Sequence, residues 1–175
     1  MPSNILSVAG IKAGFSWNFE QTTAFGSNTA NAGSFSYSSS LANGTGAGKA
    51  TVFYASEFDL AASANLAIDL AAGVTDVFGD SISFTKIRYI YIEVVADAAN
   101  VKVGSSITVG GHAAAVASFF GSATDTIKVR NGGCFQLSCT DATGYAVTGT
   151  TADTIKILNN DAVNALTVRI GIVGE

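Results

Sequence analysis

The sequence predicts an all-β protein: an antiparallel β-sandwich or jelly-roll-like barrel with an extended N-terminal segment. Three observations predict this fold. Apolar and polar residues alternate with a period of two through most of the chain after residue 50. The alternating runs are short, and Gly-, Asn- and Asp-rich turns separate them. Hydrophobic residues make up 48% and charged residues 13% of the 175 residues, which excludes intrinsic disorder and suits a single core.

Residues 1–50 differ in composition from residues 51–175. We expect residues 51–175 to form the sandwich domain. A Ser-, Asn- and Gly-rich tract at 26–48 contains no charged residue. Two interpretations of this N-terminal segment stay open: extra strands of the same domain, or an arm that docks on a neighbouring subunit. Its alternating aromatic residues indicate extended segments lying against an apolar partner, and they are interface candidates: Phe15, Trp17, Phe19, Phe35 and Tyr37.

Two runs, 51–60 and 166–172, predict half-buried antiparallel strands. The run at 58–73 is rich in Ala and Leu, as a helix would be, but Leu66, Ile68 and Leu70 alternate, which favours a strand. In the two half-buried strands, one face carries the apolar residues Val52, Tyr54, Phe58 and Leu60, and Leu166, Val168, Ile170 and Ile172.

The run at 87–95 is apolar on both faces, so we expect it to lie centrally in its sheet or to be covered by a second subunit. Its Tyr89 and Tyr91 join the interface candidates. The motif DTIKVRN at 125–131 returns as DTIKILN at 153–159, which predicts a duplicated hairpin. Further short strands are expected at 101–109, 113–120, 125–130, 134–139, 145–148 and 153–158.

The charge pattern argues against a nucleic-acid partner. The net charge is -4, and the nine Lys and Arg are scattered along the chain. A charge-free stretch at 103–124 breaks into two β-like runs, so no membrane span is expected, and no secretory signal is visible at the start. We expect six basic side chains on the solvent faces of strands: Lys86, Arg88, Lys128, Arg130, Lys156 and Arg169.

The sequence contains no strong motif for a catalytic or metal-binding site, and we expect neither an enzyme nor a cofactor. The glycine-rich GTGAGKAT at 44–51 lacks the spacing of a phosphate-binding loop and predicts a flexible loop. His112 is the sole histidine and suits a turn. Cys134 and Cys139 are too far apart along a strand to bridge each other, which suits folding in a reducing cytosol.

Three groups of acidic and amide residues were weighed as sites. Asn159, Asn160 and Asp161 could hold calcium but are commoner as a turn. Glu57 and Asp59 share a strand face, and Asp125 and Asp153 precede the two repeated motifs; in each case a solvated face or a turn is the simpler interpretation.

The last hundred residues carry an ordered set of β motifs. They are TDVFGDSISFTKIRYIYIE at 75–93, ITVGG at 107–111, FFG at 119–121, VRNGGCFQL at 129–137, GTTADTIKILNN at 149–160 and LTVRIGIVG at 166–174. Together these motifs resemble small virion-associated β proteins encoded near the head and tail genes of tailed bacteriophages.

The resemblance implies a structural virion protein, of the capsid decoration or accessory head type, that binds and stabilises the capsid. The low share of charged residues and the strand at 87–95, apolar on both faces, predict that copies of the chain form a closed homo-oligomer, such as a trimer. The resemblance adds the major capsid protein or other virion proteins as partners. A phage tail or fibre component is the near alternative. A carbohydrate-binding β-sandwich is another, with Trp17, Tyr54, Tyr89 and Tyr91 as its exposed aromatic residues.

Overall fold

The computed structural model describes residues 8–22, 28–97 and 102–175, and it confirms the all-β prediction. Short polar turns separate the strands, and the one α-helix of the described residues has four residues. In chain order the elements are β1 (Val8–Thr22), β2 (Asn28–Asn43), β3 (Lys49–Ala50), β4 (Val52–Leu60), β5 (Asn65–Asp69), β6 (Val74–Thr75), β7 (Ser81–Ile82), β8 (Lys86–Val94), β9 (Ser106–Gly110), α1 (Ala117–Phe120), β10 (Thr126–Arg130), β11 (Cys134–Ser138), β12 (Tyr145–Ala146), β13 (Thr154–Asn159) and β14 (Leu166–Gly174).

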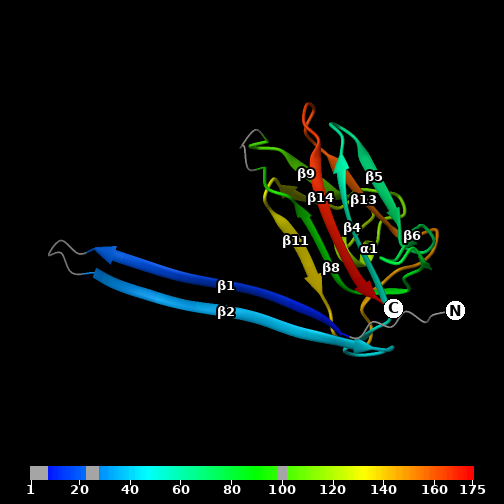
Figure 1. The fold of residues 1–175 in the computed structure, drawn as a ribbon, viewed down its shortest axis with the longest axis horizontal. Helices are drawn as coiled ribbons and strands as arrows, with labels where there is room; N and C mark the ends of the chain where they lie inside the picture. The colour runs from blue at the N-terminus through cyan, green and yellow to red at the C-terminus, as the bar shows by residue number, and fades with distance from the viewer. Residues whose placement is uncertain (1–7, 23–27, 98–101) are drawn as a thin grey trace.

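Eight of these strands form two antiparallel sheets packed face to face (Figure 1). One sheet has the order β11-β8-β14-β4, with β12 also pairing with β8, and the other has the order β10-β9-β13-β5. Counted in chain order, the eight strands run 6-3-8-1 and 5-4-7-2 in the two sheets. This is the strand order of a jelly roll, which is built from two Greek keys.

The core lies between the inner faces of the two sheets, and the period-two alternation explains which residues enter it. From β14 come Val168, Ile170 and Ile172, and from β9 come Ile107 and Val109, all of them buried. The predicted faces of the strands at 51–60 and 166–172 are therefore confirmed. The segment at 58–73 is also extended, with β5 in place of a helix.

β8 is the central strand that its two-sided apolar pattern predicts, since β14 pairs with one edge and β11 and β12 pair with the other. Ile90, Ile92 and Val94 lie on its inner face, and all three are apolar and buried. Its outer face carries Tyr89 and Tyr91, both half-buried.

The strand predicted at 113–120 is wrong. This segment makes a single parallel bridge at Ala115 and then turns into α1. Phe119 and Phe120 pack against the core from this turn, and the ring of Phe119 lies 5.0 Å from that of Tyr145. A helical turn brings adjacent aromatic residues to the same apolar region, whereas a strand would point them to opposite faces.

The two copies of the DTIK motif lie in β10 and β13, on opposite sides of β9. β13 pairs with β5 and β9 and with neither β12 nor β14, its neighbours in sequence, so the second copy forms no hairpin and the predicted duplicated hairpin is wrong. The predicted facing is confirmed, because Ile127, Val129, Ile155 and Ile157 all pack toward the core. The repeated motif therefore supplies equivalent inner faces to two strands that share a neighbour.

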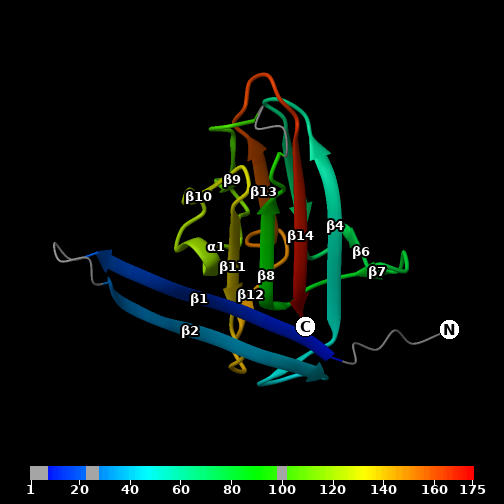
Figure 2. The same ribbon diagram turned by 60° about the vertical axis from the view of Figure 1, so that its left-hand side comes forward.

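β1 and β2 pair along their whole length as an antiparallel ribbon that projects from the sandwich (Figure 1). The ribbon starts at the end of the sandwich where β14 ends, and turning the molecule shows it passing the lower ends of β8 and β11 (Figure 2). From Ile11 to Thr22 it reaches about 36 Å at about 3.3 Å per residue. Of the two interpretations of the N-terminal segment, the structure shows paired strands, most of whose length lies beyond the sandwich.

Candidate functional site

The register of the ribbon places all of its aromatic residues on one face. Phe15 lies opposite Phe35, Trp17 opposite Gly33 and Ala13 opposite Tyr37. Because side chains alternate along a strand, these odd-numbered residues share a face. We call this the apolar ribbon face. The opposite face carries small and polar residues: Lys12, Gly14, Ser16, Asn18, Ser34, Ser36 and Ser38.

The aromatic side chains of the apolar ribbon face form an exposed cluster. The ring centroids of Phe15 and Trp17 lie 5.8 Å apart in a stacked arrangement, and those of Trp17 and Phe35 lie 5.3 Å apart. Phe15 is 65% exposed, Phe35 72% and Tyr37 42%. Phe19 stands opposite Asn31 in the register, and its side chain lies outside the described residues.

Gly33 lets the indole of Trp17 lie flat across the ribbon. A Cβ built at Gly33 would come within 2.3 Å of a ring carbon of Trp17, so any larger residue would displace the ring. Glycine within a strand interior often marks such a close approach. No pattern in the sequence marks Gly33, because its role depends on its pairing with Trp17 across the ribbon.

The base of the ribbon continues the same face into a small core of its own. Ile11 and Leu41 are buried there with Ala50 and Val173, and Phe53 and Tyr89 pack against them. The apolar ribbon face is therefore buried within the chain at Ile11 and Leu41, and the same face is exposed to solvent farther along the ribbon, at Phe15 and Phe35.

Arg88 fixes the chain beside this base, and its predicted position on a solvent face is wrong because its side chain is 0% exposed. The β14 register pairs Val173 with Tyr89 and then Gly174 with Ile87, so Arg88 has no partner in that ladder. An extra residue of this kind redirects a side chain out of the strand alternation. Here it turns the guanidinium toward three loops.

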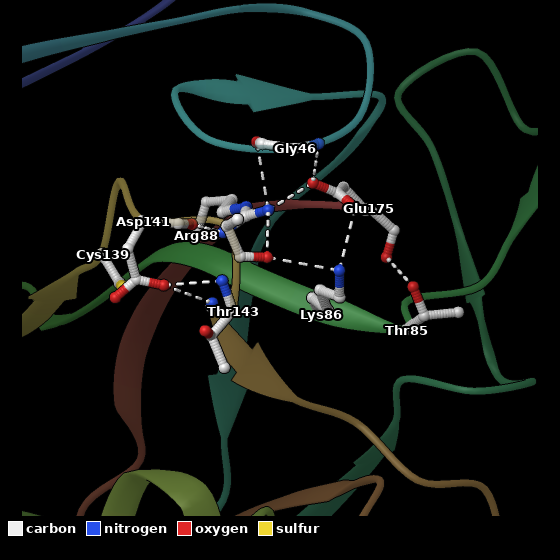
Figure 3. Close-up of polar contacts among 10 residues, drawn as sticks. Gly46, Thr85, Lys86, Arg88, Cys139, Asp141, Thr143 and Glu175 are labelled. Carbon is white, nitrogen blue, oxygen red and sulfur yellow. Dashed lines mark hydrogen bonds and ion pairs between the residues drawn. The ribbon is translucent and has the colours of Figure 1, made fainter.

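The guanidinium of Arg88 connects the ribbon, the end of β14 and the loop after β11 (Figure 3). It donates to the carbonyl oxygens of Asp141, Gly46 and Ala142, the last two at 3.1 and 3.2 Å, and pairs with the Glu175 carboxylate. These hydrogen bonds pair the buried guanidinium charge with loop carbonyl oxygens and a carboxylate, which offsets the free-energy cost of removing the charge from water.

Glu175 is the second half of this anchor. Its Oε1 accepts the Gly46 amide at 2.8 Å, and its Oε2 lies 3.5 Å from the Lys86 ammonium. Burial by itself would raise the pKa of Glu175, but the hydrogen bonds from Arg88 and Gly46 and the charges of Arg88 and Lys86 outweigh burial and lower it. The loop at 44–51, predicted to be flexible, is thus tied to Arg88 and Glu175.

The outer face of the β11-β8-β14-β4 sheet has three rows of side chains that differ in chemistry. The row nearest the ribbon is mainly apolar and lies under Ile11 and Leu41, the middle row is uncharged, and the far row is mainly charged. From β11 across to β4 the rows are Ser138, Tyr89, Val173 and Phe53; Gln136, Tyr91, Gly171 and Ala55; and Cys134, Glu93, Arg169 and Glu57.

The middle row forms an open depression of about 420 Å³, lined by Ala55, Tyr91 and Gly171 together with Glu57 and Arg169. A Cβ at Gly171 would meet no atom within 4 Å, so the space above this glycine is empty. Burial raises the pKa of Tyr91 to about 12, and the neighbouring Glu93 adds to the rise. Tyr91 therefore presents a neutral ring at the edge of the depression.

The four aromatic residues weighed for carbohydrate binding do not share a surface. Tyr54 lies on the inner face of β4 and packs against the core, whereas Tyr89 and Tyr91 lie on the outer face of β8. Trp17 belongs to the ribbon. A platform of these four side chains is therefore not formed.

The residues weighed for nucleophilic chemistry serve local structure. His112 accepts the Ala114 amide at its Nδ1 within a tight turn, as predicted. Both cysteines are free. Burial raises the pKa of the Cys139 thiol, and its hydrogen bond to Asp141 raises it further, which disfavours the reactive thiolate.

The acidic groups are likewise engaged in turns and strand pairs. Asn159 donates to the carbonyl oxygens of Leu60, Ala61 and Asn164, and Asp161 accepts the backbone amides of Val163 and Asn164. Across the strands, Glu57 pairs with Arg169 and Asp59 accepts from Thr167. Asp125 is exposed at one end of β10, and the buried Asp153 accepts from Thr150 and Thr154.

Within residues 8–22, 28–97 and 102–175, no cluster of three or more His, Cys, Asp or Glu side chains is placed to hold a metal ion. None of the helices in this part of the chain has the length and apolarity needed to cross a membrane. The described residues do form an exposed apolar surface, the apolar ribbon face, and the outer sheet face lies beside its base.

Comparison with protein-family models, with curated proteins and with solved structures finds no match to this chain.

Proposed function

We propose that this chain is a structural virion protein of the capsid decoration or accessory head type, which binds and stabilises a capsid as a homo-oligomer. It works through surfaces and not through catalysis. The apolar ribbon face is the element through which it assembles with other chains.

The observation that carries the proposal is the exposure of this aromatic face on a projecting ribbon. An isolated two-stranded ribbon is marginal in water, and one with Phe15 and Phe35 largely exposed has no gain from burial to offset its ordering. Aromatic residues at the centre of an interface contribute most of its binding energy. A partner that covers this face would supply the missing burial.

Two further features agree with a structural role. The eight-stranded jelly roll is an architecture of viral capsid domains, although lectins use it too, so this support is an analogy of fold. The low share of charged residues suits a chain surrounded by other chains, because such surfaces lose contact with water on assembly.

The test is co-sedimentation with phage particles whose structural genes lie beside the gene for this chain. We expect the purified chain to pellet with capsids that lack it. A shortened variant, in which residues 15–35 are replaced by Asn-Gly, should stay in the supernatant. This variant keeps Ile11 and Leu41, so the base of the ribbon is preserved.

The control is a variant with charges on the polar ribbon face, Ser16→Lys with Ser34→Glu, which should still pellet. Binding to tails or fibres in place of heads would support the tail or fibre alternative. No association of the purified chain with these particles, whether with heads, tails or fibres, would overturn the proposal.

A further inference from the structure

We infer that the apolar ribbon face of one copy docks on the outer face of the β11-β8-β14-β4 sheet of a second copy. The inference deepens the proposed function, since it names the partner of the ribbon. Each copy gives one ribbon and receives one, so the contact forms a closed symmetric oligomer when two copies exchange ribbons about a two-fold axis or when successive copies complete a ring.

The outer sheet face is already a ribbon-binding surface within one chain. Ile11 and Leu41, at the base of the ribbon, cover the row that contains Phe53, Val173 and Tyr89. The ribbon then leaves the sandwich, and the next row is left open. A second ribbon lying on this open row would contact the next outward-facing residues of the same strands, two positions beyond the residues that Ile11 and Leu41 cover.

The two open surfaces match in chemistry. Between residues 8 and 43 the charged residues are Lys12 and Glu20, and their register positions belong to the polar side of the ribbon. The receiving row, made of Gln136, Tyr91, Gly171 and Ala55, is also uncharged. The nearest charged groups of the sheet, Glu57 and Arg169, line the depression and are paired with each other, so the contact would cover an ion pair and no unpaired charge.

The two surfaces also match in shape. The ribbon face carries protruding rings, whereas the receiving row is low at Gly171, where no atom lies within 4 Å of the Cβ position. A ring such as that of Phe35, 72% exposed, fits a depression walled on one side by the ring of Tyr91.

The outer face of the other sheet is a poor receiver. Its strands β10, β13 and β5 present Lys128, Arg130, Lys156 and Asp69, interleaved with Thr and Asn. Laying an uncharged aromatic ribbon there would remove water from these charged groups without pairing them. The favoured face, in contrast, has an uncharged row next to the ribbon, and its nearest charges, Glu57 and Arg169, are paired with each other.

The area is that of a weak contact. Four strands about 4.8 Å apart span about 19 Å, so a ribbon about 10 Å wide that lies across the row covers about 190 Å² of the sheet. If two copies exchange ribbons, two ribbon faces and two receiving faces are covered, which makes about 760 Å² in total and falls in the range of weak, transient interfaces.

The test measures the mass of the full chain by analytical ultracentrifugation up to about 100 μM, a range that detects contacts of this size. We expect the wild type to form a dimer or trimer. Phe15→Lys combined with Phe35→Glu should weaken association at least tenfold. Ser16→Lys combined with Ser34→Glu changes the adjacent register pair on the opposite face and should leave association unchanged.

The receiving face has its own matched pair of variants. Ala55 and Ala67 are exposed alanines on the outer faces of β4 and β5, that is, of opposite sheets. We expect Ala55→Lys to weaken association at least tenfold and Ala67→Lys to have no effect. Gly171→Lys, whose side chain would stand in the depression, repeats the test at a second position.

A mixing experiment identifies the second copy as the partner. The Phe15/Phe35 variant lacks a ribbon face and Ala55→Lys lacks a receiving face, so neither should self-associate. Mixed one to one, they should form hetero-dimers through one intact ribbon and one intact receiving face. Circular dichroism spectra and thermal unfolding curves like those of the wild type establish that each variant is folded.

A monomeric wild type, or equal behaviour of Ala55→Lys and Ala67→Lys, would overturn the inference. This result is separable from the proposed function. A monomer that still pellets with capsids through its ribbon keeps the proposed function and refutes the docking on a second copy. An oligomer that binds no particle does the reverse.

Discussion

Arg88 and Glu175 show how two charged residues hold the base of the ribbon in place. The Arg88 side chain is fully buried and bonds the loop at Gly46, the loop at Asp141 and Ala142, and Glu175. A buried pair such as this one is weak evidence for stability, because desolvation offsets much of the attraction. Its effect is geometric: it sets the point and direction from which β2 returns to the sandwich.

We expect Glu175→Gln to lower the free energy of unfolding at about pH 7 by about 1 to 2 kcal/mol. In acid, the difference between the variant and the wild type should disappear. The folded state lowers the pKa of Glu175, so its stabilisation is fully present above the ordinary carboxyl pKa of about 4.3. It is lost as the pH falls through the lower pKa of the folded state. Urea unfolding of both chains across this range gives the measurement.

Glu57→Gln is the control, because Glu57 forms an exposed ion pair with Arg169. Pairs of this kind contribute little, so its effect on the free energy of unfolding should be small at every pH. A deficit of Glu175→Gln that stays constant down to about pH 2.5 would contradict the linkage argument.

At the scale of the element, the ribbon divides into a base that belongs to the fold and an outer part that does not. Ile11 and Leu41 are 1% and 0% exposed, whereas Phe15 and Phe35 are 65% and 72% exposed. Four residues along one strand therefore separate a core position from a solvent position on the same face. The difference comes from where the sandwich ends, and not from the ribbon sequence.

We expect the shortened variant, with residues 15–35 replaced by Asn-Gly, to unfold with nearly the same free energy as the monomeric Phe15/Phe35 variant, within about 0.5 kcal/mol. Leu41→Ala should instead cost about 2 to 5 kcal/mol, because it empties a buried position at the base. Urea unfolding of the three chains measures both effects. A large loss of stability in the shortened variant would show that the outer ribbon supports the fold.

At the scale of the whole molecule, one core joins the two sheets of the jelly roll. Ile157 of β13 and Ile92 of β8 are both fully buried and belong to the same cluster, although they come from different sheets. In a jelly roll each sheet draws its strands from the whole length of the chain, so neither sheet can form before distant segments meet. Unfolding should therefore be cooperative.

We expect Ile157→Ala to lower the free energy of unfolding by about 2 to 5 kcal/mol. Hydrogen exchange should lose protection equally at β8 and β9, since the cavity weakens the core that both sheets share. Lys156→Ala, on the outer side of the same strand, should change the stability by less than about 0.5 kcal/mol. Loss of protection in one sheet alone would contradict a single cooperative core.

The sequence by itself determined the all-β class and the inner residues of the main strands, and for the strand at 87–95 it left two alternatives, a central place in its sheet or cover by a second subunit. Alternation is a local property that each run carries within itself, so Ile170 and Ile172 could be assigned to the core without knowing their neighbours. It also placed Phe15 and Trp17 on one face of a strand.

Only the tertiary structure decided which residues lie across from one another. The space over Gly171, the contact of Gly33 with Trp17 and the burial of Arg88 each depend on a partner strand or loop that is distant in sequence. Such contacts arise from register and from a local bulge, and neither leaves a periodic trace in the chain. The receiving row beside the ribbon, Tyr91 excepted, was therefore invisible until β4, β14 and β8 lay side by side.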